Sequence, residues 1–153
     1  MAGSMKRIGI IICICNLMFL DVGQAQELNE SNVAGAVVNA FKSKYPNIYV
    51  YEWEWKRKLA LYEAEFRLNG RKAEAFYTAD GKWVKTKIEL EDEELPAVIA
   101  ENIHKGSYAG WEIDDVNELS TPENARFYEV ELKSGKRKVY QYFTPDGQQL
   151  QQP

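Results

Sequence analysis

The sequence predicts an α+β protein made of two tandem repeats, each a helix followed by a roughly four-stranded antiparallel sheet. Apolar and polar residues alternate over several short segments, which is the pattern of half-buried strands. Tight-turn residues, among them Asn69-Gly70 and Asp80-Gly81, separate these segments. Strands joined by such short turns run antiparallel, because a parallel return needs a long crossover. The pattern of residues 61–81 recurs at 127–147, which indicates a duplication.

Residues 1–25 have the three parts of a secretory signal peptide. Met5-Lys6-Arg7 is basic, Ile8–Leu20 is an apolar run of 13 residues, and Gly23 and Ala25 are small residues at a cleavage site. The run is short for a membrane anchor, which is the alternative. Residues 1–4 fit an upstream start or a cloning remnant. We therefore expect a secreted, periplasmic protein with no stable membrane insertion after signal cleavage.

The rest of the chain, residues 26–153, is predicted to form a single domain whose two repeats span about 30–90 and 94–150. Both cysteines, Cys13 and Cys15, lie in the signal peptide, so the mature chain has no disulfide and no thiolate nucleophile. The whole sequence has 45% hydrophobic and 27% charged residues and a formal net charge of −4. This balance indicates a globular protein and makes nucleic acid a poor partner.

In the first repeat, Val33, Val37, Phe41 and Tyr45 lie on one apolar stripe, which predicts a helix over about 33–45. The helix should end there because the residue before Pro46 disfavours helical geometry. Alternating residues predict strands at 48–55, 61–68, 71–78 and 82–90.

The second repeat opens with the acidic run Glu91–Glu94. This run could bind a cation, but it is more typical of a solvated linker whose carboxylates favour the positive end of the next helix. That helix should begin near Pro96 and end near Lys105. Strands are expected at 111–119, 126–133 and 136–144, followed by a short polar strand or tail at 148–153.

The two repeats match at a constant offset of 66 residues. Tyr62–Phe66 matches Tyr128–Leu132, and Asp80-Gly81 matches Asp146-Gly147. The chain resembles the PepSY-like, β-lactamase-inhibitor-like family of secreted bacterial proteins. The residues of the resemblance are Ala40–Asn47, Tyr62–Phe66, Asn69-Gly70, Ala73–Tyr77 and Asp80–Trp83, then Glu94–Val98, Tyr128–Glu131 and Asp146-Gly147. Gln149 departs from the pattern, because it replaces Trp83. The resemblance implies the family's tandem helix-plus-sheet fold, a binding or inhibitory role and no enzymatic activity.

We identify no catalytic residue, metal site or cofactor site in the sequence. His104, the only histidine, is expected at a helix end, without the partners that a triad or a zinc site needs. Carboxylates such as Glu63 and Glu65 recur at every second residue beside lysines and arginines. A solvated sheet face with cross-strand ion pairs explains that pattern better than acid–base catalysis does.

The aromatic residues are the better functional clue. Alternation places Tyr49, Tyr51, Trp53 and Trp55 on one strand face, where they either fill the core or form an exposed patch for a partner. The candidate contact residues are Trp53, Trp55, Tyr142, Tyr51 and Tyr140. We therefore expect a secreted, non-catalytic module that inhibits or senses an unidentified protein or peptide. The alternative is a small-ligand sensor or carrier with a cleft between the repeats. The sequence indicates no particular oligomeric state.

Overall fold

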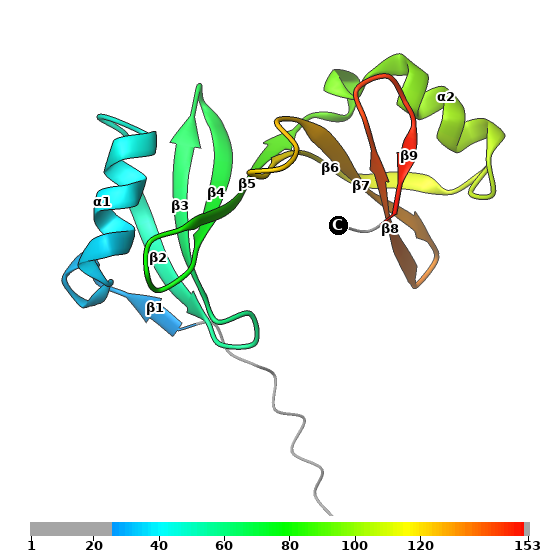
Figure 1. Cartoon of the computed structure of the whole chain (residues 1–153). Coiled ribbons are helices and arrows are strands. Elements are labelled where there is room, and N and C mark those ends of the chain that lie inside the picture. Colours follow the sequence, from blue (N-terminus) through cyan, green and yellow to red (C-terminus); the bar gives the residue numbers. More distant parts are fainter. Residues whose placement is uncertain (1–25, 152–153) are drawn as a thin grey trace, which may run out of the picture.

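The computed structural model describes residues 26–151, so the predicted signal peptide and both cysteines lie outside the described residues. Within that range the chain forms nine strands, two α-helices and two short 3₁₀ helices (Figure 1). In order they are β1 (Gln26–Leu28), η1 (Glu30–Asn32), α1 (Gly35–Lys44), β2 (Val50–Lys56), β3 (Leu61–Leu68), β4 (Arg71–Tyr77), β5 (Trp83–Leu90), η2 (Asp92–Glu94), α2 (Ala97–Lys105), β6 (Glu112–Ser120), β7 (Phe127–Ser134), β8 (Arg137–Phe143) and β9 (Gln149–Leu150).

All nine strands belong to one antiparallel sheet, in the order β1-β2-β3-β4-β5-β6-β7-β8-β9. The prediction of two tandem repeats, each a helix followed by a roughly four-stranded antiparallel sheet, is therefore wrong. The two halves are joined because β5 pairs with β6, from Thr86 opposite Ser120 to Leu90 opposite Val116. The fold is mostly β, with two short helices packed on a continuous sheet.

Both α-helices cover the same face of this sheet. Ile88 and Leu90 lie two residues apart on β5 and so point to one side. Ile88 packs against the core under α1, and Leu90 packs against the core under α2. The sheet bends where the two halves meet, and its hollow side has no helix (Figure 1).

Turn residues fix the hairpins as the sequence predicts. Asn69 and Gly70 both adopt positive φ, 52° and 84°, which is the geometry of the tightest hairpin turn. Helix α1 is shorter than predicted at its start, because Val33 and Ala34 are extended and the helix begins at Gly35. It ends at Lys44, just ahead of Tyr45-Pro46.

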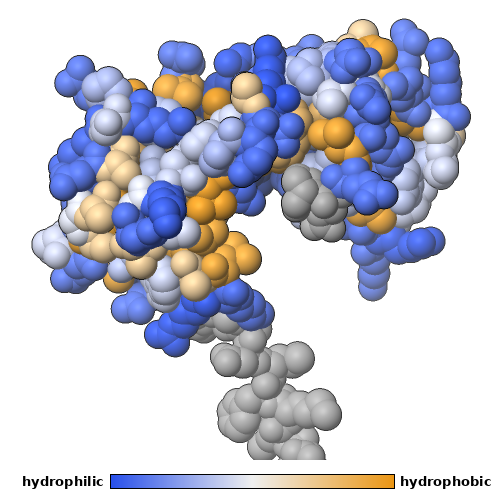
Figure 2. Space-filling model, viewed as in Figure 1, coloured by the Kyte–Doolittle hydropathy of each residue, from blue (hydrophilic) through white to orange (hydrophobic). Residues whose placement is uncertain are grey.

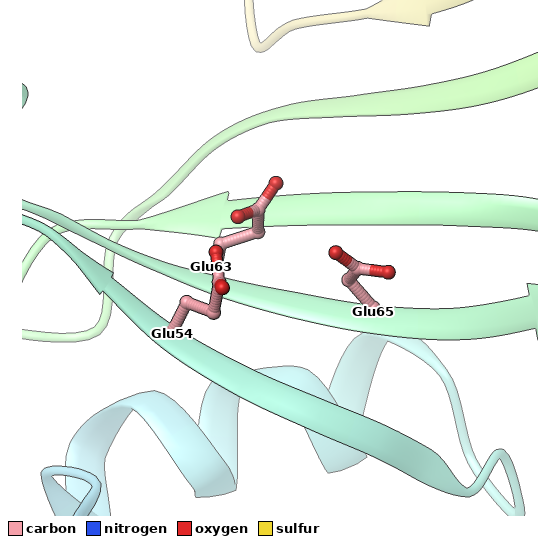
Figure 3. A group of neighbouring side chains, drawn as sticks. All are labelled: Glu54, Glu63 and Glu65. Atoms are coloured by element: carbon pink, nitrogen blue, oxygen red, sulfur yellow. The ribbon is translucent and has the colours of Figure 1, made fainter. Parts of the chain in front are cut away.

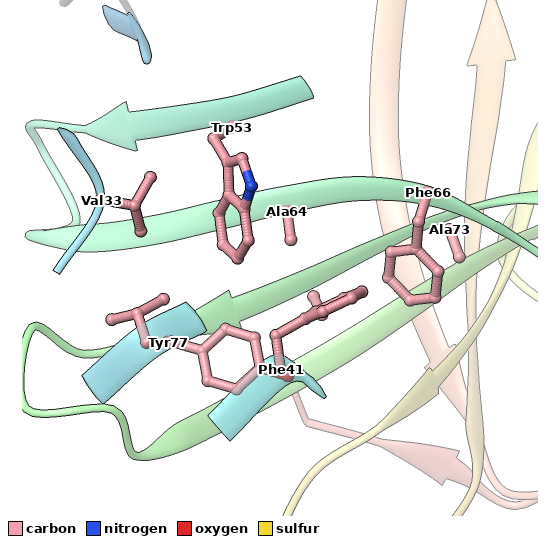
Figure 4. Packing of buried hydrophobic residues seen from close by; sticks show 9 residues of the cluster. Val33, Phe41, Trp53, Ala64, Phe66, Ala73 and Tyr77 are labelled. Carbon is pink, nitrogen blue, oxygen red and sulfur yellow. The ribbon is translucent and has the colours of Figure 1, made fainter. Parts of the chain in front are cut away.

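The first core is aromatic and lies between α1 and the sheet. Phe41 of α1 makes edge-on contacts with Trp53 and Phe66, with ring centroids 5.7 and 5.0 Å apart. Figure 4 shows these side chains together with Tyr77, all directed into the space between helix and sheet. A second buried cluster, formed by Leu95, Ile99, Ile103, Val116, Tyr128, Val130, Leu132 and Phe143, lies under α2. Neither α-helix of the described chain is long and apolar enough to cross a membrane.

Candidate functional site

The sheet face that points away from both helices is the candidate functional site, and we call it the helix-free face. Strand register assigns to it the residues that alternate with the two cores. They include Glu54, Glu63, Glu65, Lys72, Glu74, Phe76, Lys85, Lys87, Glu89, Asp115, Asn117, Leu119, Phe127, Glu129, Glu131, Lys138, Tyr140 and Tyr142.

Ion pairs hold the charged side chains of the helix-free face in place. Lys72 lies 3.3 Å from Glu65 on the neighbouring strand, and Lys138 contacts Glu131. Glu63 and Glu131 are buried although no helix covers them. The sequence predicts that the alternating carboxylates form cross-strand ion pairs on a sheet face, and these two pairs confirm it. Such pairs also order long side chains, which would otherwise lose entropy on binding.

Three carboxylates on this face form a tight group. The oxygens of Glu54, Glu63 and Glu65 lie within 4.8 Å of one another and point away from α1 (Figure 3). Carboxylates at this spacing are donors that hard cations accept. The Lys56 ammonium contacts Glu54 and Glu63, and Lys72 pairs with Glu65. Each member of the group therefore has a lysine partner, but Lys56 is shared by two carboxylates and Lys72 also lies 3.7 Å from Glu74.

An apolar cluster occupies the other half of the helix-free face. Leu119 and Phe127 are neighbours across β6 and β7, and they pack with Tyr142. The Tyr142 hydroxyl donates a hydrogen bond to Glu129, 2.9 Å away. Burial and then this carboxylate raise the pKa of Tyr142 above its ordinary value, so the hydroxyl stays protonated and a donor. Tyr140, 50% exposed, donates in the same way to Glu131.

The structure separates the five predicted contact residues. Tyr51, Tyr140 and Tyr142 lie on the helix-free face, Tyr51 beside Glu65. Trp53 is 3% exposed within the first core. Trp55 is half-buried on the helix side, in a tilted ring contact with Tyr62 whose centroids are 4.7 Å apart.

The expectation that Tyr51 shares a face with Trp53 and Trp55 is wrong. The β2–β3 register shifts between Val50 and Glu52, so Tyr51 is the extra residue of a β-bulge. One extra residue reverses the alternation on that side of the bulge. His104 lies in the last turn of α2, as predicted, with Nδ1 2.7 Å from the Ala100 carbonyl oxygen.

Sequence reasoning missed several functional candidates on the helix-free face, among them Leu119, Phe127 and Asn117. Alternation alone could place them on one side of their strands. It could not show that β5 and β6 are neighbours, and this pairing brings the two halves of the face together. A separate hollow of about 330 Å³ lies beside the end of α2 and is lined by Asn102, Tyr108 and Phe143 among others. It belongs to one half of the molecule.

Comparison with known proteins assigns the chain to a family. The family described as "Putative beta-lactamase-inhibitor-like, PepSY-like" matches residues 60–150, and the chain belongs to it. The resemblance seen in the sequence is therefore confirmed. No curated protein sequence matches the chain.

Several solved structures of similar proteins are from Bacteroides species. A BLIP-like protein of Bacteroides fragilis is 33% identical, with a TM-score of 0.66 over 76% of this chain and 82% of that one. A DUF2874 family protein of Bacteroides ovatus is 26% identical, with a TM-score of 0.67 over 76% and 84%. A protein of Bacteroides eggerthii, described as "putative periplasmic", is 24% identical, with a TM-score of 0.67 over 78% and 86%.

Proposed function

We propose that this protein is a non-catalytic binding module of the periplasm that recognises a protein or peptide through the helix-free face. The observation that supports this most is the placement of both helices on one side of a nine-stranded sheet. The opposite side is left as a wide, curved surface that presents tyrosine and charged side chains. Tyrosine is enriched where proteins bind one another, because it offers a large contact area and a hydroxyl.

The helix-free face is also ordered before any partner arrives. Lys72 and Lys138 are paired with carboxylates on neighbouring strands, and the two tyrosines of β8 are hydrogen-bonded to Glu129 and Glu131. Preordered side chains cost less entropy on binding, so this face suits tight recognition. The family description and the BLIP-like relative agree with an inhibitory role for such a surface.

A site-specific cross-linking experiment tests the proposal. A photoreactive phenylalanine analogue replaces Tyr140 on the helix-free face or, as matched control, Val98 on the outside of α2; both positions are exposed, at 50% and 41%. In a periplasmic extract of the source organism, we expect a discrete adduct from position 140 only, and excess unlabelled protein should abolish it.

Adducts of equal yield from both positions, or none from position 140, would contradict the proposal. The family description makes a purified β-lactamase the first defined partner to test. We expect Tyr140→Ala to weaken binding to the captured partner by at least about tenfold, since interface tyrosines often contribute about 2 kcal/mol.

A further inference from the structure

A polar hollow lies at the centre of the helix-free face, where β4, β5 and β6 run side by side. Its volume is about 230 Å³. The residues that line it are Lys72, Glu74, Lys87, Glu89, Asp115 and Asn117. The hollow spans the join between the two halves, since β5 and β6 pair there.

The buried amide of Asn117 lacks one hydrogen bond. Asn117 is 1% exposed, and its Nδ2 donates to Asp115 Oδ2 at 2.7 Å. Its Oδ1 accepts no hydrogen bond from any described residue. A buried carbonyl oxygen without a donor is rare in folded proteins and calls for a partner. The hollow therefore has an acceptor ready for a donor that the chain itself does not supply.

The charges around the hollow favour a cation. Lys72 is paired with Glu65 and Glu74, and Lys87 lies 3.8 Å from Glu129. Glu89 and Asp115 have no ion-pair partner among residues 26–151. Both also line an adjoining hollow of about 290 Å³, whose other acidic residues are Glu91, Asp92, Glu93 and Asp114.

The spacing of these acids distinguishes between kinds of cation. Within the described chain, the one group of three carboxylates close enough for a metal ion is Glu54, Glu63 and Glu65. The acids of the hollow are more widely spread. A guanidinium group has five N–H donors in a fixed plane, so it can reach a carboxylate and an amide oxygen at once. An ammonium group is a compact charge and fits such a spread of acceptors less well.

We propose that this hollow binds an arginine side chain of the partner, with Glu89 and Asp115 as counter-charges and Asn117 Oδ1 as an acceptor. The assignment of that arginine to a protein or peptide rests on the function proposed above. The proposal of a guanidinium group in the hollow rests only on the residues that line it, their charges and the unpaired Asn117 oxygen.

The hollow can be tested without the partner, by NMR titration of the isotope-labelled protein with capped tripeptides. The probe is acetyl-Gly-Arg-Gly-amide, and its matched control is the citrulline peptide, which has nearly the same shape but no charge. We expect the arginine peptide to shift the Asn117 side-chain amide signals saturably, with at least tenfold tighter binding than the citrulline peptide.

Pairs of variants then test whether the arginine peptide binds in the hollow. Glu89→Gln with Asp115→Asn should weaken arginine-peptide binding at least tenfold while the backbone spectrum stays native. Glu101→Gln with Glu123→Gln removes two charges from outside the hollow and should leave the affinity within twofold. Asn117→Leu should lose the arginine preference if it retains a native spectrum.

Three results would overturn the assignment: no saturable shift, equal binding of the arginine and citrulline peptides, or tighter binding of acetyl-Gly-Glu-Gly-amide. The last result would make the hollow an anion site of Lys72 and Lys87. Failure of the cross-linking test alone would remove the protein partner and leave the guanidinium site standing. A cross-linked partner together with no peptide binding in the hollow would support the protein partner and remove the guanidinium site.

Discussion

Thr86 links the side chains of Tyr45 and Trp83 where the end of α1 meets β5. It is 2% exposed, its hydroxyl lies 2.5 Å from the Tyr45 hydroxyl, and it accepts a hydrogen bond from Trp83 Nε1 at 2.9 Å. A hydroxyl can donate and accept at once, so one threonine serves both neighbours. We expect Thr86→Val to lower the free energy of unfolding by about 2 kcal/mol, because it leaves both groups unpaired.

Thr86→Ser is the control for this substitution, because it keeps the hydroxyl and loses only a methyl group, at a cost of about 0.8 kcal/mol. Urea denaturation of the three proteins measures the difference. A valine variant as stable as the serine variant would show that these two hydrogen bonds contribute no net stability.

Two neighbours in the β4–β5 turn stabilise the ionised form of Asp80. The Thr78 hydroxyl donates to its carboxylate, and Lys82 Nζ lies 2.9 Å away. Both lower the pKa of Asp80 to about 2, from an ordinary value of 3.8. A lowered pKa in the folded state means that the stabilisation is fully present above about pH 4 and is lost as the pH falls toward 2. We expect Thr78→Val to raise the pKa of Asp80, as measured by NMR titration of its carboxyl carbon. Thr144→Val, in the similar turn before Gly147, should leave that pKa unchanged.

The turn between β4 and β5 packs directly on the start of α1. Gly81 has φ of +85°, and a Cβ there would lie 2.7 Å from the Ala36 carbonyl oxygen. Gly70 has nearly the same φ, +84°, with nothing within 4 Å. A comparison of alanine substitutions at the two glycines therefore distinguishes the free-energy cost of a left-handed backbone from that of a steric clash.

We expect Gly70→Ala to lower the free energy of unfolding by about 1 kcal/mol and Gly81→Ala by about 3 kcal/mol. The first value is backbone strain alone, and the second adds the displacement of α1 from the turn. Thermal and urea denaturation of both variants provide the measurement. Equal losses would mean that α1 moves away from the turn without cost.

For individual helices and strands, the sequence predicts most elements well but misses their irregularities. Residues 61–68 form β3 as predicted, because alternation and Asn69-Gly70 both define it. The three-residue strand β1 is not predicted, since Gln26–Leu28 is too short to show alternation. The bulge at Tyr51 has no residue signature of its own, yet it decides which aromatic side chains reach the helix-free face.

The continuity of the sheet could not be read from the sequence. In a hairpin the turn fixes the register of the two strands that it joins. No such turn joins β5 and β6, because η2 and α2 lie between them in the chain. Repeat units found by internal similarity suggest independent sheets, and the pairing of Leu90 with Val116 overrides that suggestion. The site depends on this pairing, because it places Glu89 on β5 opposite Asn117 on β6.

A single sheet with two cores should unfold as one unit. Strand β5 contributes Ile88 to the first core and Leu90 to the second, so the loss of either core removes support from a strand that both halves share. We expect one unfolding transition and one global level of protection against hydrogen exchange. Phe66→Leu in the first core should lower that protection by about 1–3 kcal/mol in β7 as well as in β3.

The reciprocal variant, Val130→Ala in the second core, should lower protection in β3 as well as in β7. Both residues are fully buried, so each substitution loses core packing without touching the β5–β6 pairing. Native-state hydrogen exchange followed by NMR reads both halves in one sample. If Phe66→Leu lowered the protection of β3 and left that of β7 unchanged, the two halves would unfold independently. The β5–β6 pairing would then connect them without coupling their stabilities. Equal losses would instead mean that β5 and β6 couple the two cores, which would keep the curved helix-free face intact as one rigid surface.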